Sequence, residues 1–200
     1  MMHTAYIGMG ANLASSAGTP EQTLTAAADR LAELGRLVAR SSLYSTEPVG
    51  FADQPRFINA AITLETKLSP SDLLAALMDI ERAFGRDRSV GIPNGPRTLD
   101  LDILLYGDEL VREPGLEIPH PRLGDRAFVL VPLAEIASNV VDVTRGASVG
   151  QLLQTLLQRS PREIDAVVPL QCEIWRASVS GRDVADARAD ARISDADRRR

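Results

Sequence analysis

The sequence is poor in several residue types, and each shortage excludes a class of protein. Its one cysteine, Cys172, rules out an internal disulfide bond and predicts a cytoplasmic location. No segment is long and apolar enough to cross a membrane, so we expect no membrane partner. Of 22 basic residues only Lys67 is a lysine, and no G-x-x-x-x-G-K-[ST] motif is present, which excludes a P-loop. Metal-binding Cys/His spacings and a nucleophile elbow are missing as well.

Charge and length limit the function further. The net charge is −5, the pI is about 5.1 and aromatic residues make up 4%, which together argue against nucleic acid as a partner. The 200 residues are enough for one domain with a hydrophobic core. We assign this domain to residues 1–170. Residues 171–200 should form a disordered extension, because Arg, Asp and Ala alternate there with few large apolar residues.

Apolar segments bounded by turn residues predict four strands and two helices in the order β-α-β-β-α-β. Thr19 and Ser69 fit helix N-caps, and Gly35 and Gly85 fit the ends of these helices. The strands are expected at 4–9, 37–45, 57–64 and 99–106. This order predicts an α+β protein with a ferredoxin-like core, an antiparallel sheet with helices packed on it. Further C-terminal helices are expected at 127–136 and 149–157.

Two carboxylates interrupt the last of these strands. Asp100 and Asp102 are two residues apart, so their side chains point to the same face. Two close carboxylates on an apolar strand are unfavourable unless a positive charge lies between them. An ion pair with arginine at a sheet edge would satisfy this requirement. The neighbouring arginines favour a site for phosphate and Mg²⁺, a metal that binds one or two carboxylates together with phosphate oxygens.

Other side chains near this strand suit a phosphate-containing substrate. The guanidinium groups of Arg86, Arg88, Arg97 and Arg126 can each bind two phosphate oxygens, although isolated surface arginines are common. His120 lies between two prolines that restrict its backbone. It could donate to a phosphate or a nucleotide, or it could be a surface histidine without a role.

A second pair of residues suits a planar ring. Phe57 and Asn59 share one face of a predicted strand. An aromatic ring beside an amide that donates and accepts hydrogen bonds can hold a planar heterocycle. From the residues alone, core packing of Phe57 and a hydrogen bond of Asn59 along the strand are the preferred explanation of the pattern.

The order of these motifs is similar to that of a known family. The matching segments are YIGMGANL at 6–13, STEPVG at 45–50, DQPRFINAA at 53–61, GPRTLDLD at 95–102, IPHPR at 118–122 and RAF at 126–128. Over Ala5 to about Leu157 the chain therefore resembles the 6-hydroxymethyl-7,8-dihydropterin pyrophosphokinases of folate synthesis.

The resemblance implies a reaction, its cofactor and its site. Enzymes of this family transfer the β,γ-diphosphate of ATP to 6-hydroxymethyl-7,8-dihydropterin, which gives AMP and the pterin diphosphate for tetrahydrofolate synthesis. Two Mg²⁺ ions bind with ATP, and Asp100 and Asp102 match their ligands. The residues matched to catalysis are Arg86, Arg97, Asp100 and Asp102. The residues matched to ATP binding are Glu81, Arg86, Arg88, Arg97, Ile103, His120 and Arg126. The residues matched to the pterin pocket are Thr46, Pro48, Val49, Gly50, Phe57, Asn59 and Phe128.

The sequence departs from the family pattern at several positions. Ile92-Pro93-Asn94 replaces an arginine and a tryptophan that often precede the Gly-Pro pair, in a loop that acts as a mobile lid in the family. Pro121 follows the histidine where an aromatic residue is common. We expect an active, monomeric enzyme with altered lid behaviour. An inactive relative, another Mg²⁺-dependent transferase on this fold and an RNA-binding module are the alternatives.

Overall fold

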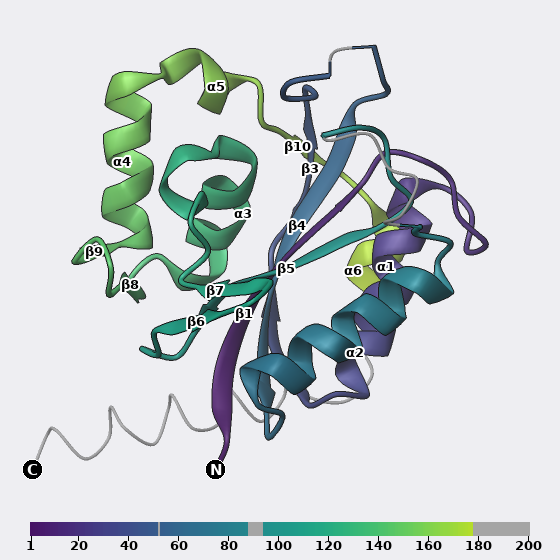
Figure 1. Ribbon diagram of the computed structural model, residues 1–200. Coiled ribbons are helices and arrows are strands. Elements are labelled where there is room, and N and C mark those ends of the chain that lie inside the picture. The colour runs from purple at the N-terminus through teal and green to yellow at the C-terminus, as the bar shows by residue number, and fades with distance from the viewer. Residues whose placement is uncertain (52, 88–93, 178–200) are drawn as a thin grey trace, which may run out of the picture.

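The computed structural model describes residues 1–51, 53–87 and 94–177. An antiparallel sheet stands at the centre, and helices cover both of its faces (Figure 1). In chain order the elements are β1 His3–Ala11, α1 Pro20–Ala32, β2 Arg36–Arg40, β3 Leu43–Thr46, β4 Phe57–Thr66, α2 Pro70–Ala83, β5 Asp100–Tyr106, β6 Val111–Glu113, β7 Leu116–Ile118, the 3₁₀ turn η1 Leu123–Asp125, α3 Ala127–Ala137, β8 Val141–Asp142, β9 Ala147–Ser148, α4 Val149–Arg159, α5 Pro161–Asp165, β10 Val168–Leu170 and α6 Glu173–Ala177.

The sheet confirms the predicted fold class. Its strand order is β10-β3-β4-β1-β5, with β2 also paired to β4, and every pairing is antiparallel. The first and last strands of the β-α-β-β-α-β unit, β1 and β5, therefore lie side by side. The carboxyl end of β1 meets the amino end of β5, where Gly10 pairs with Asp100 and Gly8 with Asp102. This register brings the predicted acidic pair to one end of the sheet.

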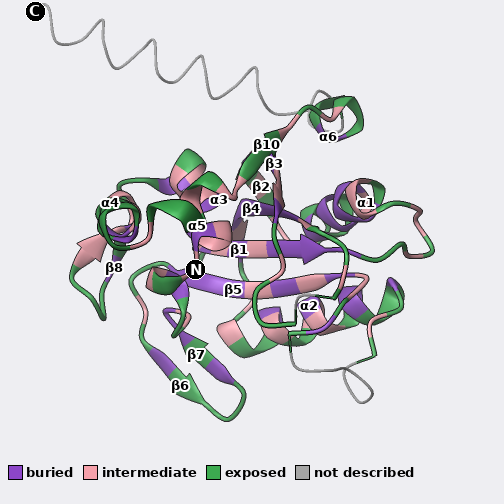
Figure 2. Cartoon of the chain, turned by 90° about the horizontal axis from the view of Figure 1, so that it is seen from above, coloured by how far each residue is buried: buried purple, intermediate pink, exposed green. Residues whose placement is uncertain are grey.

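Two hydrophobic cores hold the helices on the sheet. The first lies under α1 and α2 and contains Ile7, Leu24, Leu77 and Leu101. The second lies on the opposite face, under α3 and α4, and includes Leu104 and Leu130 among its buried residues. Figure 2 shows the strands between these two pairs of helices. In the described part of the chain helices pack on both faces of the sheet, which differs from the open sheet face that RNA-binding modules of this topology use.

The predicted helix starts are confirmed in atomic detail. The Thr19 side chain accepts a hydrogen bond from the Gln22 N–H, and the Gln22 side chain accepts one from the Thr19 N–H, which completes a capping box. Ser69 caps α2 in the same way through the Asp72 N–H. Pro20 and Pro70 occupy the first helical position, where the missing N–H costs no hydrogen bond.

One predicted strand was wrong in its extent. Residues 37–45 form two strands, β2 and β3, instead of one. At the break, the Ser41 hydroxyl accepts a hydrogen bond from the Ala61 N–H at 2.9 Å, and the carboxylate of Glu135 accepts from the Ser42 N–H at 2.9 Å. Side-chain oxygens thus bond to backbone donors at this point, while the Ser41 N–H still donates to the Ala61 carbonyl at 2.9 Å.

The C-terminal segment extends the sheet. Strand β10 pairs with β3, and α6 packs beside α1. Trp175 of α6 is 3% exposed and donates from Nε1 to the Ser41 carbonyl at 2.8 Å. Residues 173–177 are thus ordered, whereas we expected disorder from residue 171. The rest of the expected extension lies outside the described residues, and the division into domain and tail stays a prediction. Among the described residues, no helix meets the length and hydropathy that a membrane crossing requires.

Candidate active site

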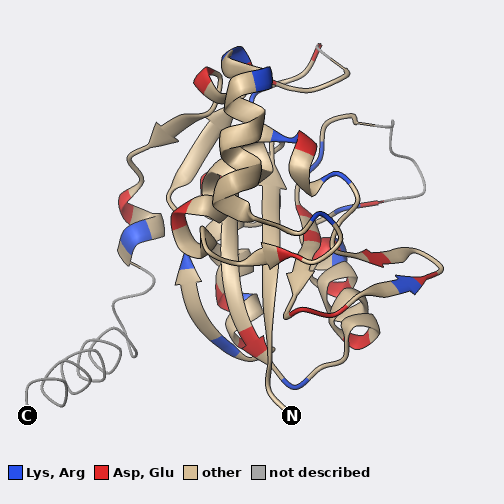
Figure 3. Cartoon of the chain, turned by 90° about the vertical axis from the view of Figure 1, so that its left-hand side faces the viewer, with Lys and Arg blue, Asp and Glu red and all other residues tan. Residues whose placement is uncertain are grey.

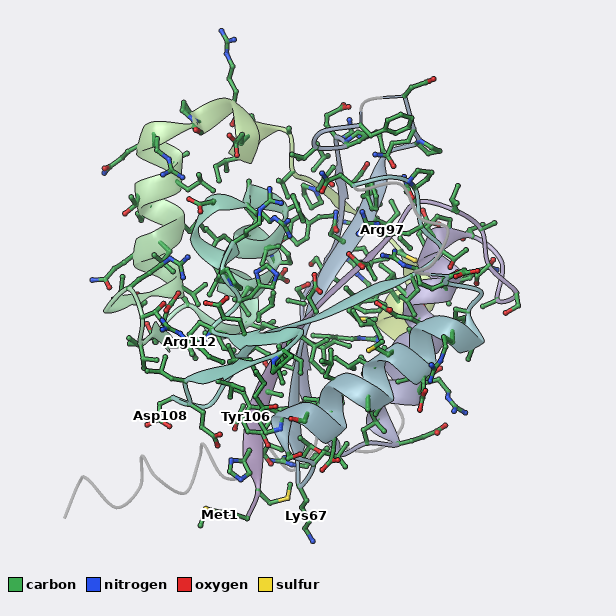
Figure 4. The ribbon with its side chains drawn as sticks, in the orientation of Figure 1. Met1, Lys67, Arg97, Tyr106, Asp108 and Arg112 are labelled. Carbon is green, nitrogen blue, oxygen red and sulfur yellow. The ribbon has the colours of Figure 1, made fainter. Side chains whose placement is uncertain are left out.

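A pocket open to solvent lies where four strand ends meet. In an antiparallel sheet the carboxyl ends of β1 and β3 lie beside the amino ends of β4 and β5. Arg97, just before β5, lies at the opposite end of that strand from Tyr106 and Asp108 (Figure 4). The lining residues are Gly8, Met9, Gly10, Thr46, Glu47, Val49, Phe57, Asn59, Ala60, Asn94, Arg97, Asp100, Asp102, Leu104, Arg122, Arg126, Phe128 and Val129.

One half of the pocket combines the acidic pair with arginines. Arg97 Nη1 lies 2.7 Å from Asp100 Oδ2, and Arg86 Nη2 lies 3.3 Å from Asp100 Oδ1. Asp102 lines the same pocket. The structure therefore brings Arg86, Arg97, Asp100 and Asp102 together, as expected. Arg88 and most of the expected lid loop lie outside the described residues.

Asn12 connects three segments around this half, a role that the sequence did not reveal. Its Oδ1 accepts a hydrogen bond from the Arg97 N–H at 2.7 Å. Its Nδ2 donates to the Gln54 side chain and to the Pro55 carbonyl, both at 3.0 Å. Asn12 is buried, so these hydrogen bonds are shielded from water. They fix the Arg97 backbone relative to β1 and to the loop before β4.

The other half of the pocket is aromatic and amide-lined. Thr46, Val49, Phe57, Asn59 and Phe128 all line it, as expected for a ring-binding pocket. Asn59 Nδ2 donates to the Thr46 hydroxyl at 2.7 Å, which fixes the orientation of the amide.

Two arginines face the aromatic rings of this half. The Arg97 guanidinium carbon lies 5.6 Å from the centre of the Phe57 ring, and the Arg126 guanidinium carbon lies 5.5 Å from that of Phe128. Both distances are within the range of cation–π attraction. The cationic and aromatic halves of the pocket are therefore in direct contact.

Gly10 makes room for the Asn59 amide. A Cβ atom at residue 10 would lie 2.9 Å from Asn59 Oδ1, closer than real Cβ atoms approach. The neighbouring strand therefore needs glycine here for the amide to reach the wall of the pocket.

Arg126 and His120 lie on the segment that leads into α3. Burial lowers the pKa of Arg126, and the nearby Arg122 lowers it further. The buried Arg126 Nε has no hydrogen-bond partner among the described residues, and a ligand oxygen would satisfy it. Burial and the charges of Arg126 and Arg122 lower the pKa of His120 to about 4. Its Nδ1 accepts from the Arg122 N–H at 3.1 Å, so the neutral ring carries its proton on Nε2.

Six expected residues in the described part of the chain lie outside the pocket lining: Glu81, Arg86, Ile103, His120, Pro48 and Gly50. Glu81 is buried under β5, where its carboxylate accepts a hydrogen bond from the Leu101 N–H at 2.9 Å. The Ile103 side chain is part of the core under α1 and α2. Pro48 and Gly50 belong to the loop between β3 and β4, next to the lining residue Val49.

Three polar residues line the pocket although the sequence suggested no role for them: Glu47, Asn94 and Arg122. Arg122 is exposed and lies close enough to His120 and Arg126 for its charge to lower both pKa values. In the sequence, the position of Arg122 two residues after His120 is the signal that points to a role at the site.

The acidic pair alone provides few ligands for a metal. Within residues 1–51, 53–87 and 94–177, no group of three or more His, Cys, Asp and Glu side chains is placed to hold an ion. Two carboxylates on one strand face fit Mg²⁺, which completes its octahedron with water and phosphate oxygens. They do not resemble a closed structural metal site.

Fold and pocket together define an α+β protein with an acidic, arginine-rich edge beside an aromatic pocket. The model of the family 7,8-dihydro-6-hydroxymethylpterin-pyrophosphokinase (HPPK) matches residues 6–138. The chain belongs to this family, which confirms the resemblance and the predicted enzyme class.

Individual relatives agree with this assignment. The 2-amino-4-hydroxy-6-hydroxymethyldihydropteridine pyrophosphokinase of Pseudomonas aeruginosa is 47% identical over 142 residues, 70% of this chain and 84% of the relative. The Bacillus subtilis enzyme of the same name is 40% identical over 153 residues, 76% of this chain and 88% of the relative. A crystal structure of wild-type HPPK-DHPS from Plasmodium falciparum covers 82% of this chain with a TM-score of 0.62 and 14% identity. The chain spans 47% of that protein, and the likeness shows the shared fold.

Proposed function

We propose that this chain transfers the β,γ-diphosphate of ATP to the hydroxymethyl group of 6-hydroxymethyl-7,8-dihydropterin. In this reaction the pterin hydroxyl oxygen forms a bond to the β-phosphorus and its proton is released to water, while the bond from that phosphorus to the α-phosphate oxygen breaks and AMP leaves. Family membership and the division of the pocket into a charged half and an aromatic half support the proposal.

The charged half suits the triphosphate. Arg97, Arg86 and Arg126 present guanidinium groups that can hold phosphate oxygens in fixed directions. The unpaired Arg126 Nε favours an oxygen ligand, because a buried donor without an acceptor is unfavourable. A neutral His120 can donate from Nε2 to the nucleotide without adding charge. Asp100 and Asp102 would hold Mg²⁺, which neutralises phosphate charge when it is bound.

The aromatic half suits the pterin. Phe57 and Phe128 can stack on the planar ring, and the Asn59 amide can bond to the edge of the ring. The hydrogen bond from Asn59 to Thr46 holds the amide in place before the substrate binds, which lowers the entropy lost on binding.

One observation carries the proposal: Arg97 contacts Asp100 on one side and the ring of Phe57 on the other. A transfer between two substrates requires their reacting atoms to be held close together and in line. The Arg97 guanidinium stands where the phosphate chain and the pterin would meet. It is placed to offset negative charge on the transferred group.

The competing functions have less support. An RNA-binding module would need an exposed aromatic sheet face and a basic surface. In the view of Figure 3, Lys and Arg segments alternate with Asp and Glu segments over the described chain. We propose that the protein has no nucleic-acid or membrane partner and acts as a cytoplasmic monomer, as the sequence predicts.

The test is a coupled assay of AMP release with ATP, Mg²⁺ and the reduced hydroxymethyl pterin. We expect AMP formation that depends on both the pterin and Mg²⁺, with pterin diphosphate as the second product. Transfer of AMP to the pterin, with release of pyrophosphate, would instead identify a nucleotidyl transferase. ATP turnover that is independent of the pterin would contradict the proposed substrate.

A further inference from the structure

A short hairpin after α3 carries an ion pair whose carboxylate is buried and whose arginine is partly exposed. Strands β8 and β9 are joined by a turn in which Asp142 is fully buried. Its carboxylate accepts hydrogen bonds from the Thr144 N–H at 2.9 Å and the Arg145 N–H at 3.2 Å. Arg145 Nη1 lies 2.5 Å from the second carboxylate oxygen. Burial by itself raises the pKa of Asp142, but hydrogen bonds from Thr144 and Arg145 lower it to below the usual value.

The same arginine reaches a segment of the candidate active site. Arg145 Nη2 donates to the Pro121 carbonyl at 2.6 Å. Its side chain also lies against Gly124, where an added Cβ atom would be 3.0 Å from Arg145 Nε. The Asp142 carboxylate thus holds Arg145 Nη1, while Arg145 Nη2 holds the Pro121 carbonyl. A guanidinium group is rigid and planar, so it transmits the position of the hairpin to this backbone.

The segment held in this way carries several groups of the charged half. His120 precedes Pro121, and its N–H donates to the Leu104 carbonyl of β5 at 2.9 Å. Arg122 and Arg126 follow, and both line the pocket. The segment is therefore attached to β5 through His120 and to the β8–β9 hairpin through Arg145. Leu123, buried in the core under α3, and the Asp125–Arg159 ion pair also hold the segment.

We propose that Arg145, held by Asp142, is a positioning residue for the nucleotide half of the active site. It acts on the nucleotide through the 120–126 segment and does not touch the transferred group. The inference rests on the proposed function, because the nucleotide is the ligand whose binding the segment supports. Phe57 and Asn59, in the aromatic and amide-lined half, belong to β4, and the hydrogen bonds recorded for the Arg145 side chain do not reach them.

We expect substitution of Arg145 to change the KM for MgATP and to leave the KM for the pterin almost unchanged. Arg145→Met keeps the aliphatic stem and removes both hydrogen-bonding nitrogens. It should raise the KM for MgATP by about tenfold and leave the KM for the pterin within about twofold, because misplaced supporting groups weaken binding by such factors. Arg145→Lys keeps the charge but lacks the rigid planar fork that spans Asp142 and Pro121, so it should resemble Arg145→Met.

A matched control exists on the same segment. Arg159 Nη2 lies 3.0 Å from Asp125 Oδ1, and both side chains are more than half exposed. An exposed pair of this kind contributes little, so Arg159→Met should leave both KM values unchanged. Equal effects of Arg145→Met and Arg159→Met would overturn the inference.

Hydrogen–deuterium exchange of residues 118–126 tests the inference independently of turnover. In Arg145→Met the amide of His120 should exchange faster than in the wild type or in Arg159→Met, because the segment has lost its attachment to the β8–β9 hairpin. Faster exchange supports the attachment even if the wild type releases no AMP. The absence of AMP release would contradict only the proposed function. Unchanged exchange, or faster exchange with an unchanged KM for MgATP in an active enzyme, overturns the positioning role.

Discussion

The Arg97 guanidinium lies over the ring of Phe57, with 5.6 Å from the guanidinium carbon to the ring centre, while its Nη1 contacts Asp100 at 2.7 Å. The backbone of the same residue is held by Asn12, through the hydrogen bond between the Arg97 N–H and Asn12 Oδ1. Arg97 is therefore fixed at both its backbone and its side chain before any substrate binds. Such fixed charges avoid reorganisation during the reaction, which is the usual source of their catalytic effect.

Replacing Arg97 should affect the rate more than any other single arginine of the site. We expect Arg97→Ala to lower kcat by about 10³-fold or more, since it removes a fixed positive charge at the transferred group. Arg112→Ala is the control, because Arg112 is exposed on β6, away from the pocket. Steady-state AMP release measures both variants. A loss of tenfold or less would make Arg97 peripheral to the chemistry.

The acidic pair should be essential for turnover and dispensable for folding. Asp100→Ala and Asp102→Ala should abolish detectable AMP release, because two carboxylates on one strand face are the expected Mg²⁺ ligands. Their circular dichroism spectra and melting temperatures should stay close to those of the wild type, as partly exposed edge positions tolerate alanine. Asp108→Ala, in the exposed turn after β5, serves as the control. Comparable rates in the two site variants would remove the metal assignment.

Gly10 and Asn59 should act as one unit in pterin binding. An alanine at residue 10 would displace the Asn59 amide, since its Cβ would lie 2.9 Å from Asn59 Oδ1. Gly10→Ala and Asn59→Ala should each raise the KM for the pterin by about tenfold or more and leave the KM for MgATP unchanged, since each removes a positioned hydrogen bond. The double variant should be no worse than either single variant, because neighbours that share one interaction are not additive. Independent, additive effects would show that Gly10 does not act through Asn59.

His120 should make the stability of the protein depend on pH. Its pKa is about 4 in the folded chain, below the value of about 6.5 expected when the chain unfolds. Between these values the unfolded state binds a proton that the folded state does not, so the free energy of unfolding should fall as the pH drops from about 6.5 to about 4. Urea unfolding at several pH values measures this. His120→Gln should lose part of the dependence, and an identical pH profile in that variant would contradict the assigned cause.

Trp175 should anchor the C-terminal segment to the domain. Its ring is 3% exposed, the Arg40 guanidinium lies 4.3 Å from the ring centre, and Nε1 bonds to the Ser41 carbonyl. Trp175→Ala should reduce the free energy of unfolding by about 3–5 kcal/mol, as expected for a buried aromatic residue. Trp175→Phe should lose about 1 kcal/mol, since it removes the hydrogen bond and keeps an aromatic ring. The exposed neighbour Ile174, changed to alanine, is the control, and denaturation followed by circular dichroism gives the values.

The fold could be predicted from local signals because those signals are strong here. The caps at Thr19 and Ser69 satisfy backbone donors within a few residues, so they are visible in the sequence. The split between β2 and β3 was missed because it depends on Glu135, which lies 93 residues after Ser42. Local propensity holds no information about a contact at that separation.

The residues of the site divide in the same way, into some that the sequence reveals and others that only the structure reveals. Asp100 and Asp102 stand out because charged residues are unusual in an apolar strand. Asn12 and Arg145 do not stand out, since their partners, Arg97 and Pro121, lie 85 and 24 residues away in the sequence. Polar residues in loops are ordinary until the folded chain shows what they bond to.

The order of strands and helices, and the pairing of two aspartates on one strand face, were set by the sequence through hydrophobic periodicity, capping and the two-residue repeat of a strand. Only the tertiary structure decided that Arg97 joins the acidic pair to an aromatic pocket and that a hairpin near residue 145 holds the 120–126 segment. Both contacts depend on the antiparallel register of the sheet and on helix packing, which bring distant residues together once the two cores form.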